Sequence, residues 1–84
     1  GMAGSSLLQL LGWSEAEFDK QLEGSPIRRI GHERWQRNIA IALGNALRGE
    51  LAEDERAAMR QALAAQLPQA TAVVQEHIEW ALAQ

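Results

Sequence analysis

The chain of 84 residues has an apolar fraction of 46%, which suits one domain with a modest core, and its net charge of −3 argues against disorder. It contains no cysteine, which excludes disulfides, thiolate metal sites and a cysteine nucleophile within these residues. No apolar run approaches the roughly 20 residues that cross a bilayer, and no secretory leader opens the chain. The absence of cysteine is compatible with a reducing cytoplasm, which is the expected location.

The first residues are predicted to stand apart from the fold. Gly1 before Met2 is typical of what remains after a tag is cleaved, and residues 1–4 are interpreted as a lead-in. Residues 5–84 are predicted to form a single helical domain. Its first element is a short helix over residues 5–11, in which four of the seven residues are leucine.

A second helix is predicted to begin after Ser14. Ser14 and Glu17 have the spacing of a capping box, in which each side chain accepts from a backbone N–H that would otherwise be unpaired. Trp13 and Phe18 occupy the two positions of a hydrophobic staple across this cap. Gly24 is expected to end the helix.

The next segment is predicted to be a single turn followed by the longest helix. Ser25 is a good N-cap and Pro26 suits the first helical position, so a turn over residues 27–30 should precede a break at Gly31. A helix is predicted over residues 32–48, with Gly49 as its C-terminal cap. Its apolar stripe is Trp35, Ile39, Ala42, Leu43, Ala46 and Leu47.

Two further helices complete the predicted fold. The first begins near Glu53, where three consecutive acidic residues favour a helix N-terminus, and it ends at Pro68. The second covers residues 70–83. The inward residues are predicted to be Met59, Ala62, Leu63 and Leu67 in the first, and Val74, Ile78, Ala81 and Leu82 in the second. No segment has the alternating pattern of a strand.

An internal repeat predicts the architecture. Residues 35–44 (WQRNIAIALG) align without a gap on residues 74–83 (VQEHIEWALA), an offset of 39. A two-helix repeat of about 40 residues is typical of HEAT and armadillo proteins. We therefore predict an all-α fold of two HEAT-like hairpins of similar length, which pair the helices from Ser14 and His32 and those from Glu53 and Ala70. Small residues such as Gly44 should let the inner helices approach closely.

No catalytic, cofactor-binding or metal-binding residue is predicted. His32 and His77 lack further ligands at metal-binding spacing, so they are interpreted as helix-surface histidines. The acidic run at residues 53–55 has no apolar pocket to raise a pKa, and no serine has a plausible base. The three tryptophans are expected to pack in the core. Asn38 and Asn45 are expected to bind loop backbone groups.

A basic segment is the strongest candidate site. Four arginines and a single glutamate lie between Pro26 and Arg37 in an otherwise acidic chain. A Gly-Ser pair followed by arginines could hold a phosphate or carboxylate, with backbone N–H groups of Gly24 and Ser25 as donors. The candidate residues are Gly24, Ser25, Arg28, Arg29, Arg34 and Arg37. Alternatively, the segment is a connector whose arginines pair with neighbouring glutamates.

The sequence also resembles a known family. The runs LLGWSEAEF (residues 10–18), GSPIRRIGHERWQRNIAIALGNAL (residues 24–47) and VVQEHIEWALAQ (residues 73–84) together are similar to the C-terminal region of bacterial epoxyqueuosine reductases. The resemblance implies a HEAT-like domain of an enzyme with cobalamin and two [4Fe–4S] clusters, which reduces epoxyqueuosine in tRNA. The cluster cysteines and catalytic residues of that family have no counterpart here.

The resemblance supplies partners for the basic segment. It implies contact with the tRNA phosphate backbone and with the catalytic and cluster-binding domains of the enzyme; no membrane or DNA contact is expected. Arginine–phosphate contacts position an RNA more than they specify its sequence. The resulting hypothesis is a non-catalytic accessory domain that helps to position tRNA. The alternative is a protein-interaction or structural helical-repeat module that does not touch RNA.

Overall fold

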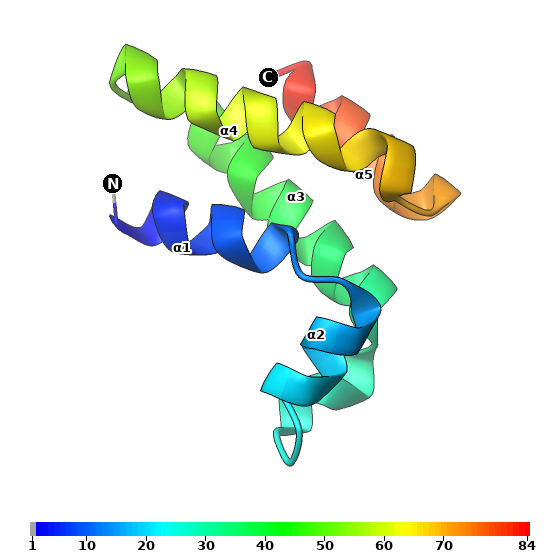
Figure 1. The fold of residues 1–84 in the computed structure, drawn as a ribbon. Helices are drawn as coiled ribbons and strands as arrows, with labels where there is room; N and C mark the ends of the chain where they lie inside the picture. Colours follow the sequence, from blue (N-terminus) through cyan, green and yellow to red (C-terminus); the bar gives the residue numbers. More distant parts are fainter. Residues whose placement is uncertain (1) are drawn as a thin grey trace.

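The computed structural model describes residues 2–84, with side chains from Leu7 onward, and these residues form helices and no strand (Figure 1). The elements are α1 (Met2–Leu11), α2 (Glu15–Gln21), the 3-10 helix η1 (Pro26–Ile30), α3 (His32–Leu47), α4 (Glu53–Gln66), the 3-10 helix η2 (Leu67–Gln69) and α5 (Ala72–Leu82). The predicted all-α class is confirmed. Gly1 lies outside the described residues, and α1 begins at Met2, three residues before the predicted start.

The helices form two layers. α3 packs most extensively against α5, and α1 lies against both α3 and α4 (Figure 1). α3 passes behind α4, whereas α2 and η1 extend beyond the far end of α1 and contact the beginning of α3. The two predicted hairpins, residues 15–47 and 53–82, are similar in overall length, but their first helices differ, because α2 has seven residues and α4 has fourteen. The HEAT-like repeat therefore stays a prediction, although its two inner helices do lie side by side.

The core lies between these layers. Ile39 and Ile78, which the internal repeat places at equivalent positions, are both buried in it. The buried cluster consists of Leu11, Ile39, Ala40, Leu43, Leu47, Met59, Leu63, Val74, Ile78 and Ala81. Its residues come from α1, α3, α4 and α5. Phe18 of α2 is also buried, against the rings of Trp35 and His32.

Gly44 permits the close approach of α3 and α5. A Cβ atom at this position would overlap the ring of Trp80 and lie 3.0 Å from the Cα of Ala81. No residue with a side chain fits there unless the two helices or the indole ring move. The prediction that small residues bring the inner helices together is confirmed at this position.

Two side chains of α3 bind the connection between α1 and α2. His32 Nε2–H donates to the carbonyl oxygen of Trp13 at 2.7 Å, and Gln36 donates to that of Leu11 at 3.2 Å. Leu11 is the last residue of α1, where carbonyls lack a partner within the helix, and Trp13 lies in the connection that follows. His32 is half-buried against Phe18, so its interpretation as a surface histidine is wrong. The stacked rings of Trp13 and Trp35, 6.0 Å apart, cover the same connection.

The N-termini of α2 and η1 follow the predicted capping chemistry. The Ser14–Glu17 capping box is present in full, and Ser25 caps η1 by accepting from the N–H of Ile27. The predicted staple residues Trp13 and Phe18 both contact the ring of Trp35. α5 begins at Ala72 instead of Ala70, because Thr71 accepts from the N–H of Val74 and acts as its N-cap.

Two arginines of α4 bind the C-terminal ends of α3 and α5. Arg56 donates to the carbonyls of Leu47 and Gly49, at 2.7 and 3.1 Å. Arg60, one turn later, donates to the carbonyl of Leu82 at 2.7 Å. A cation is favourable at this end of a helix, where carbonyls lack partners and the helix dipole is negative. α4 therefore supplies partners for carbonyls at the C-terminal ends of both inner helices.

We expect Gly44→Ala to lower the free energy of unfolding by about 1–2 kcal/mol. Overpacking costs about 1–3 kcal/mol, and the better helix propensity of alanine offsets at most about 1 kcal/mol. Chemical denaturation followed by circular dichroism measures the difference. Gly12→Ala is the matched control, because a Cβ there would meet nothing closer than 3.6 Å. Equal stability of the two variants would contradict the close contact.

Arg56→Met should lower the free energy of unfolding by about 1.5–3 kcal/mol, since the charged hydrogen bonds to two carbonyls are lost. Arg56→Lys should lose less, because one ammonium can still reach a carbonyl. Arg29→Met is the control at an exposed arginine and should leave the denaturation midpoint nearly unchanged. If both methionine variants behave alike, the capping role of Arg56 is wrong.

The capping box predicts a pH dependence. Hydrogen bonds from the backbone N–H and then the hydroxyl of Ser14 hold the pKa of Glu17 below its ordinary value. A lowered folded-state pKa stabilises the fold above the unfolded-state pKa, and this contribution is lost as the pH falls through the folded-state value. The midpoint temperatures of thermal unfolding of the unaltered chain and of Glu17→Gln should therefore differ less at acidic pH than at neutral pH. Parallel pH profiles would rule this out.

Candidate anion-binding site

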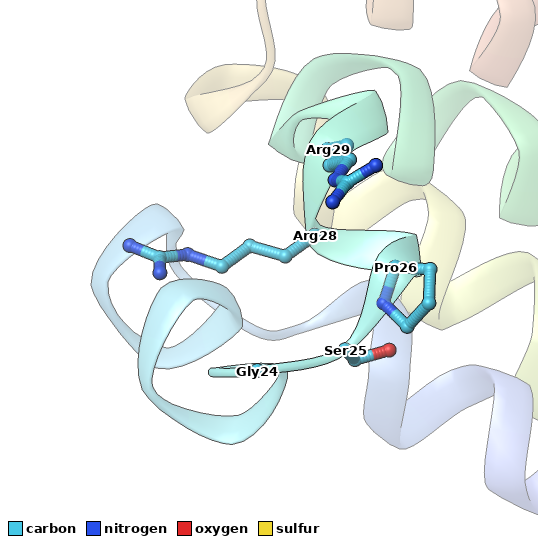
Figure 2. A pocket seen from close by; sticks show the side chains of 5 residues that line it. All are labelled: Gly24, Ser25, Pro26, Arg28 and Arg29. Atoms are coloured by element: carbon cyan, nitrogen blue, oxygen red, sulfur yellow. The ribbon is translucent and has the colours of Figure 1, made fainter.

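The structure divides the six predicted site residues into two groups. Gly24, Ser25, Arg28 and Arg29 line one surface hollow of about 430 Å³, together with Pro26 (Figure 2). Arg34 and Arg37 lie on the first turns of α3 and are not part of this lining. The predicted patch is therefore a hollow at η1 and a separate pair of arginines on the following helix.

Two glycines and one proline shape the hollow. Gly24 and Gly31 have φ values of +80° and +85°, a region that residues with a Cβ rarely adopt. Gly24 turns the chain out of α2, and Gly31 turns it from η1 into α3. Between them, Pro26 fits the first position of η1, where a backbone N–H would have no helical partner. Both predicted breaks are confirmed.

Ser25 cannot supply the backbone donor that the sequence suggested. Its N–H donates to the carbonyl of Leu22 at 2.8 Å, so this group is already used. Its Oγ accepts from the N–H of Ile27 at 3.2 Å. A hydroxyl that accepts one bond still has its own proton to donate. At this residue an anion can therefore be bound by the side chain and not by the backbone N–H.

Arg28 and Arg29 extend from η1 in different directions (Figure 2). Arg28 reaches toward α2, where its Nε lies 3.4 Å from Oδ1 of Asp19. Both side chains are about half exposed, and a surface pair of this kind contributes between zero and about 1 kcal/mol. An anion can therefore replace Asp19 at little cost. Arg29 is exposed.

The arginines of α3 differ in exposure. Arg34 is exposed, whereas Arg37 is half-buried and its Nε is enclosed without a hydrogen-bond partner in the described part of the chain. The two residues are three apart, so their side chains are neighbours on the helix surface. Arg37 therefore retains unused donor capacity although it is partly covered.

The structure also shows where the other histidine, the two asparagines and the exposed tryptophan singled out in the sequence lie. His77 Nδ1–H donates to the carbonyl of Val73, four residues earlier on α5, at 2.8 Å. Asn38 and Asn45 are exposed, and neither side chain makes a hydrogen bond within the described residues, contrary to the expected loop contacts. Trp80 is 39% exposed, so its assignment to the core is wrong. Its spacing from Ile78 already places it on a different side of the helix.

The donor set of this chain does not fit an iron–sulfur cluster. Such clusters are held mainly by cysteine thiolates, and the sequence has none. Among residues 2–84, no three His, Asp or Glu side chains are grouped as metal ligands. In the same range, every helix is too short or too polar to cross a membrane.

Comparison with known proteins identifies relatives of almost the whole chain. It is 57% identical over 83 residues to an epoxyqueuosine reductase of Alicycliphilus denitrificans, which covers 99% of this chain and 23% of the relative. Identity is 51% over 87 residues to that of Burkholderia pseudomallei, covering 98% of this chain and 21% of the relative. Identity to the epoxyqueuosine reductase of Escherichia coli is 47% over 78 residues, which cover 93% of this chain and 18% of the relative.

The chain thus spans about a fifth of the length of these curated relatives. No protein-family model matches it, and no solved structure matches it significantly. Identity at this level over nearly every residue indicates common descent, and the relatives carry one name. The chain is therefore homologous to one segment of the bacterial epoxyqueuosine reductases.

Proposed function

We propose that this chain is a non-catalytic accessory domain, C-terminal in a cytoplasmic epoxyqueuosine reductase, that helps to position tRNA. The hollow at η1 is the observation that supports the proposal most directly. It is lined by two arginines and the hydroxyl of Ser25, and no carboxylate is part of its lining. Such a surface suits a phosphate group better than a protein side chain or a neutral ligand.

The chemistry of the hollow favours positioning over sequence recognition. A guanidinium binds phosphate oxygens through two parallel N–H bonds and carries its charge at every physiological pH. Phosphates are the same at every nucleotide, so these contacts fix the placement of the RNA. Arg34 and Arg37, on the next helix, are proposed to extend the phosphate contacts along α3.

The proposal assigns the chemistry of the enzyme to other residues. The two [4Fe–4S] clusters would be held by the remaining four fifths of such a reductase, since this chain lacks cysteine, and the proposal places the cobalamin there as well. A contact with those catalytic and cluster-binding domains is part of the same proposal. The segment would contribute RNA affinity and orientation, and no bond-making step.

Arg28→Ala combined with Arg29→Ala should weaken tRNA binding and reduce its salt dependence. Each lost phosphate contact lowers the slope of log K against log salt by about 0.7–0.9. Titrations of tRNA between roughly 50 and 200 mM salt, read by fluorescence anisotropy, measure both quantities. The isolated chain should bind weakly, with a slope equivalent to a few phosphates.

The matched control replaces both arginines by lysine, which keeps the charge and removes the two-pronged hydrogen bonding. It should retain most of the slope and lose part of the affinity. If the alanine pair binds tRNA with unchanged affinity and slope, the hollow does not contact RNA. Binding of a protein partner that depends on these arginines would then favour the protein-interaction alternative.

A further inference from the structure

The outer side of α3 carries a continuous polar stripe that the fold leaves uncovered. Its residues are Arg34, Asn38, Ile41, Asn45 and Arg48, all of them exposed except Ile41, which is half-buried. Steps of four and three residues keep successive side chains on one side of a helix. Because each residue adds 1.5 Å, the two arginines lie about 10 Å on either side of Ile41 along the axis.

α5 carries a second stripe with the same spacing. Val73, His77 and Trp80 follow one another at steps of four and three residues. Val73 is 43% exposed and Trp80 is 39% exposed, although the inward residues Val74, Ile78 and Ala81 are fully buried. α5 therefore has an apolar side that the rest of the described chain does not cover.

A groove joins the two stripes. It has a volume of about 390 Å³ and is lined by Ile41 of α3 and by Glu76, His77 and Trp80 of α5. The six-membered ring of Trp80 rests against Gly44, so the backbone of α3 supports the indole from one side. The two stripes therefore face the same direction, with an aromatic ring held between the helices.

The polar groups around this groove are available to a ligand. The Nδ1–H of His77 donates to the carbonyl of Val73, which leaves Nε2 of the neutral ring as an acceptor. After Glu33, α3 has no acidic residue, and its exposed arginines at positions 34 and 48 lie beyond the two ends of the groove, whose own lining includes the carboxylate of Glu76 on α5.

We propose that this α3–α5 face binds a single-stranded segment of RNA, with an unpaired base stacked on Trp80 and phosphates bound by Arg34 and Arg48. The inference rests on the proposed function and adds a second contact, separate from the hollow at η1. An aromatic ring between cationic side chains is the arrangement that proteins use to bind single strands. Glu76 can accept from an exocyclic amino group of the stacked base.

The pattern of charge favours RNA over a protein helix as the occupant. A hydrophobic helix would need a longer apolar strip, whereas on α3 polar residues flank Ile41 on both sides. Arginines at both ends, amides between them and one exposed indole suit a ligand with regularly spaced anions and flat rings. Asparagine can donate to and accept from such a ligand.

The test compares Trp80→Leu, which removes the ring, with Trp80→Phe, which retains one. The probes are single-stranded oligoadenylate of about ten nucleotides, the same length of duplex RNA, and inorganic polyphosphate, which has charge without bases. Anisotropy of labelled RNA gives its affinity, competition gives that of polyphosphate, and circular dichroism checks that each variant is folded.

Trp80→Leu should weaken single-strand binding about tenfold and leave polyphosphate binding unchanged, since base stacking is lost and charge is retained. Trp80→Phe should retain most of the affinity and abolish the RNA-induced quenching of tryptophan fluorescence, because Trp13 and Trp35 are half-buried in their own stack. Arg34→Ala with Arg48→Ala should weaken the binding of both polyanions.

Unchanged single-strand affinity in Trp80→Leu, or equal preference for duplex RNA, would overturn the stacking site. If tRNA binding then still depends on Arg28 and Arg29, the proposed function stands and only this inference fails. If the unaltered chain binds neither tRNA nor oligoadenylate, both are wrong. A protein that binds the unaltered chain but not Trp80→Leu, with RNA affinity unaffected, would assign the face to a protein partner.

Discussion

The contact between α3 and α5 is the constraint on which the other features depend. Gly44 lets the two helix backbones approach until the indole of Trp80 fills the space that a side chain would occupy. This contact buries Ala40, Leu43, Val74, Ile78 and Ala81 along one seam. It also leaves the outer sides of both helices facing one direction. The same helix–helix contact therefore produces both the buried core and the exposed α3–α5 face.

Local features were predictable from the sequence because neighbouring residues determine them. The Ser14–Glu17 box, the Ser25 cap and the turns at Gly24 and Gly31 each depend on a few consecutive residues, and each was found where expected. The missed cap at Thr71 belongs to the same class, and a serine or threonine before the periodic stretch was the available signal.

Features that depend on contacts between segments distant in the sequence were less predictable. Arg56, Arg60 and His32 bind carbonyls of other elements, and no spacing in the chain indicates which carbonyls those are. The same holds for the candidate site. Gly24, Ser25, Arg28 and Arg29 are close in sequence and line one hollow, but the bond from the Ser25 N–H to Leu22 removes a predicted donor. Trp80 was misplaced because the repeat alignment shows periodicity and not exposure.

The two α4 arginines have a mechanical consequence for the α3–α5 surface. Arg56 and Arg60 are one turn apart on one helix and hold the last carbonyls of α3 and α5 respectively. If α5 slid along α3, at least one of these arginine–carbonyl hydrogen bonds would lengthen. The ends of the two helices are therefore both bound to α4. A ligand that spans both helices therefore binds a preorganised surface. The protein loses little conformational entropy when such a ligand binds.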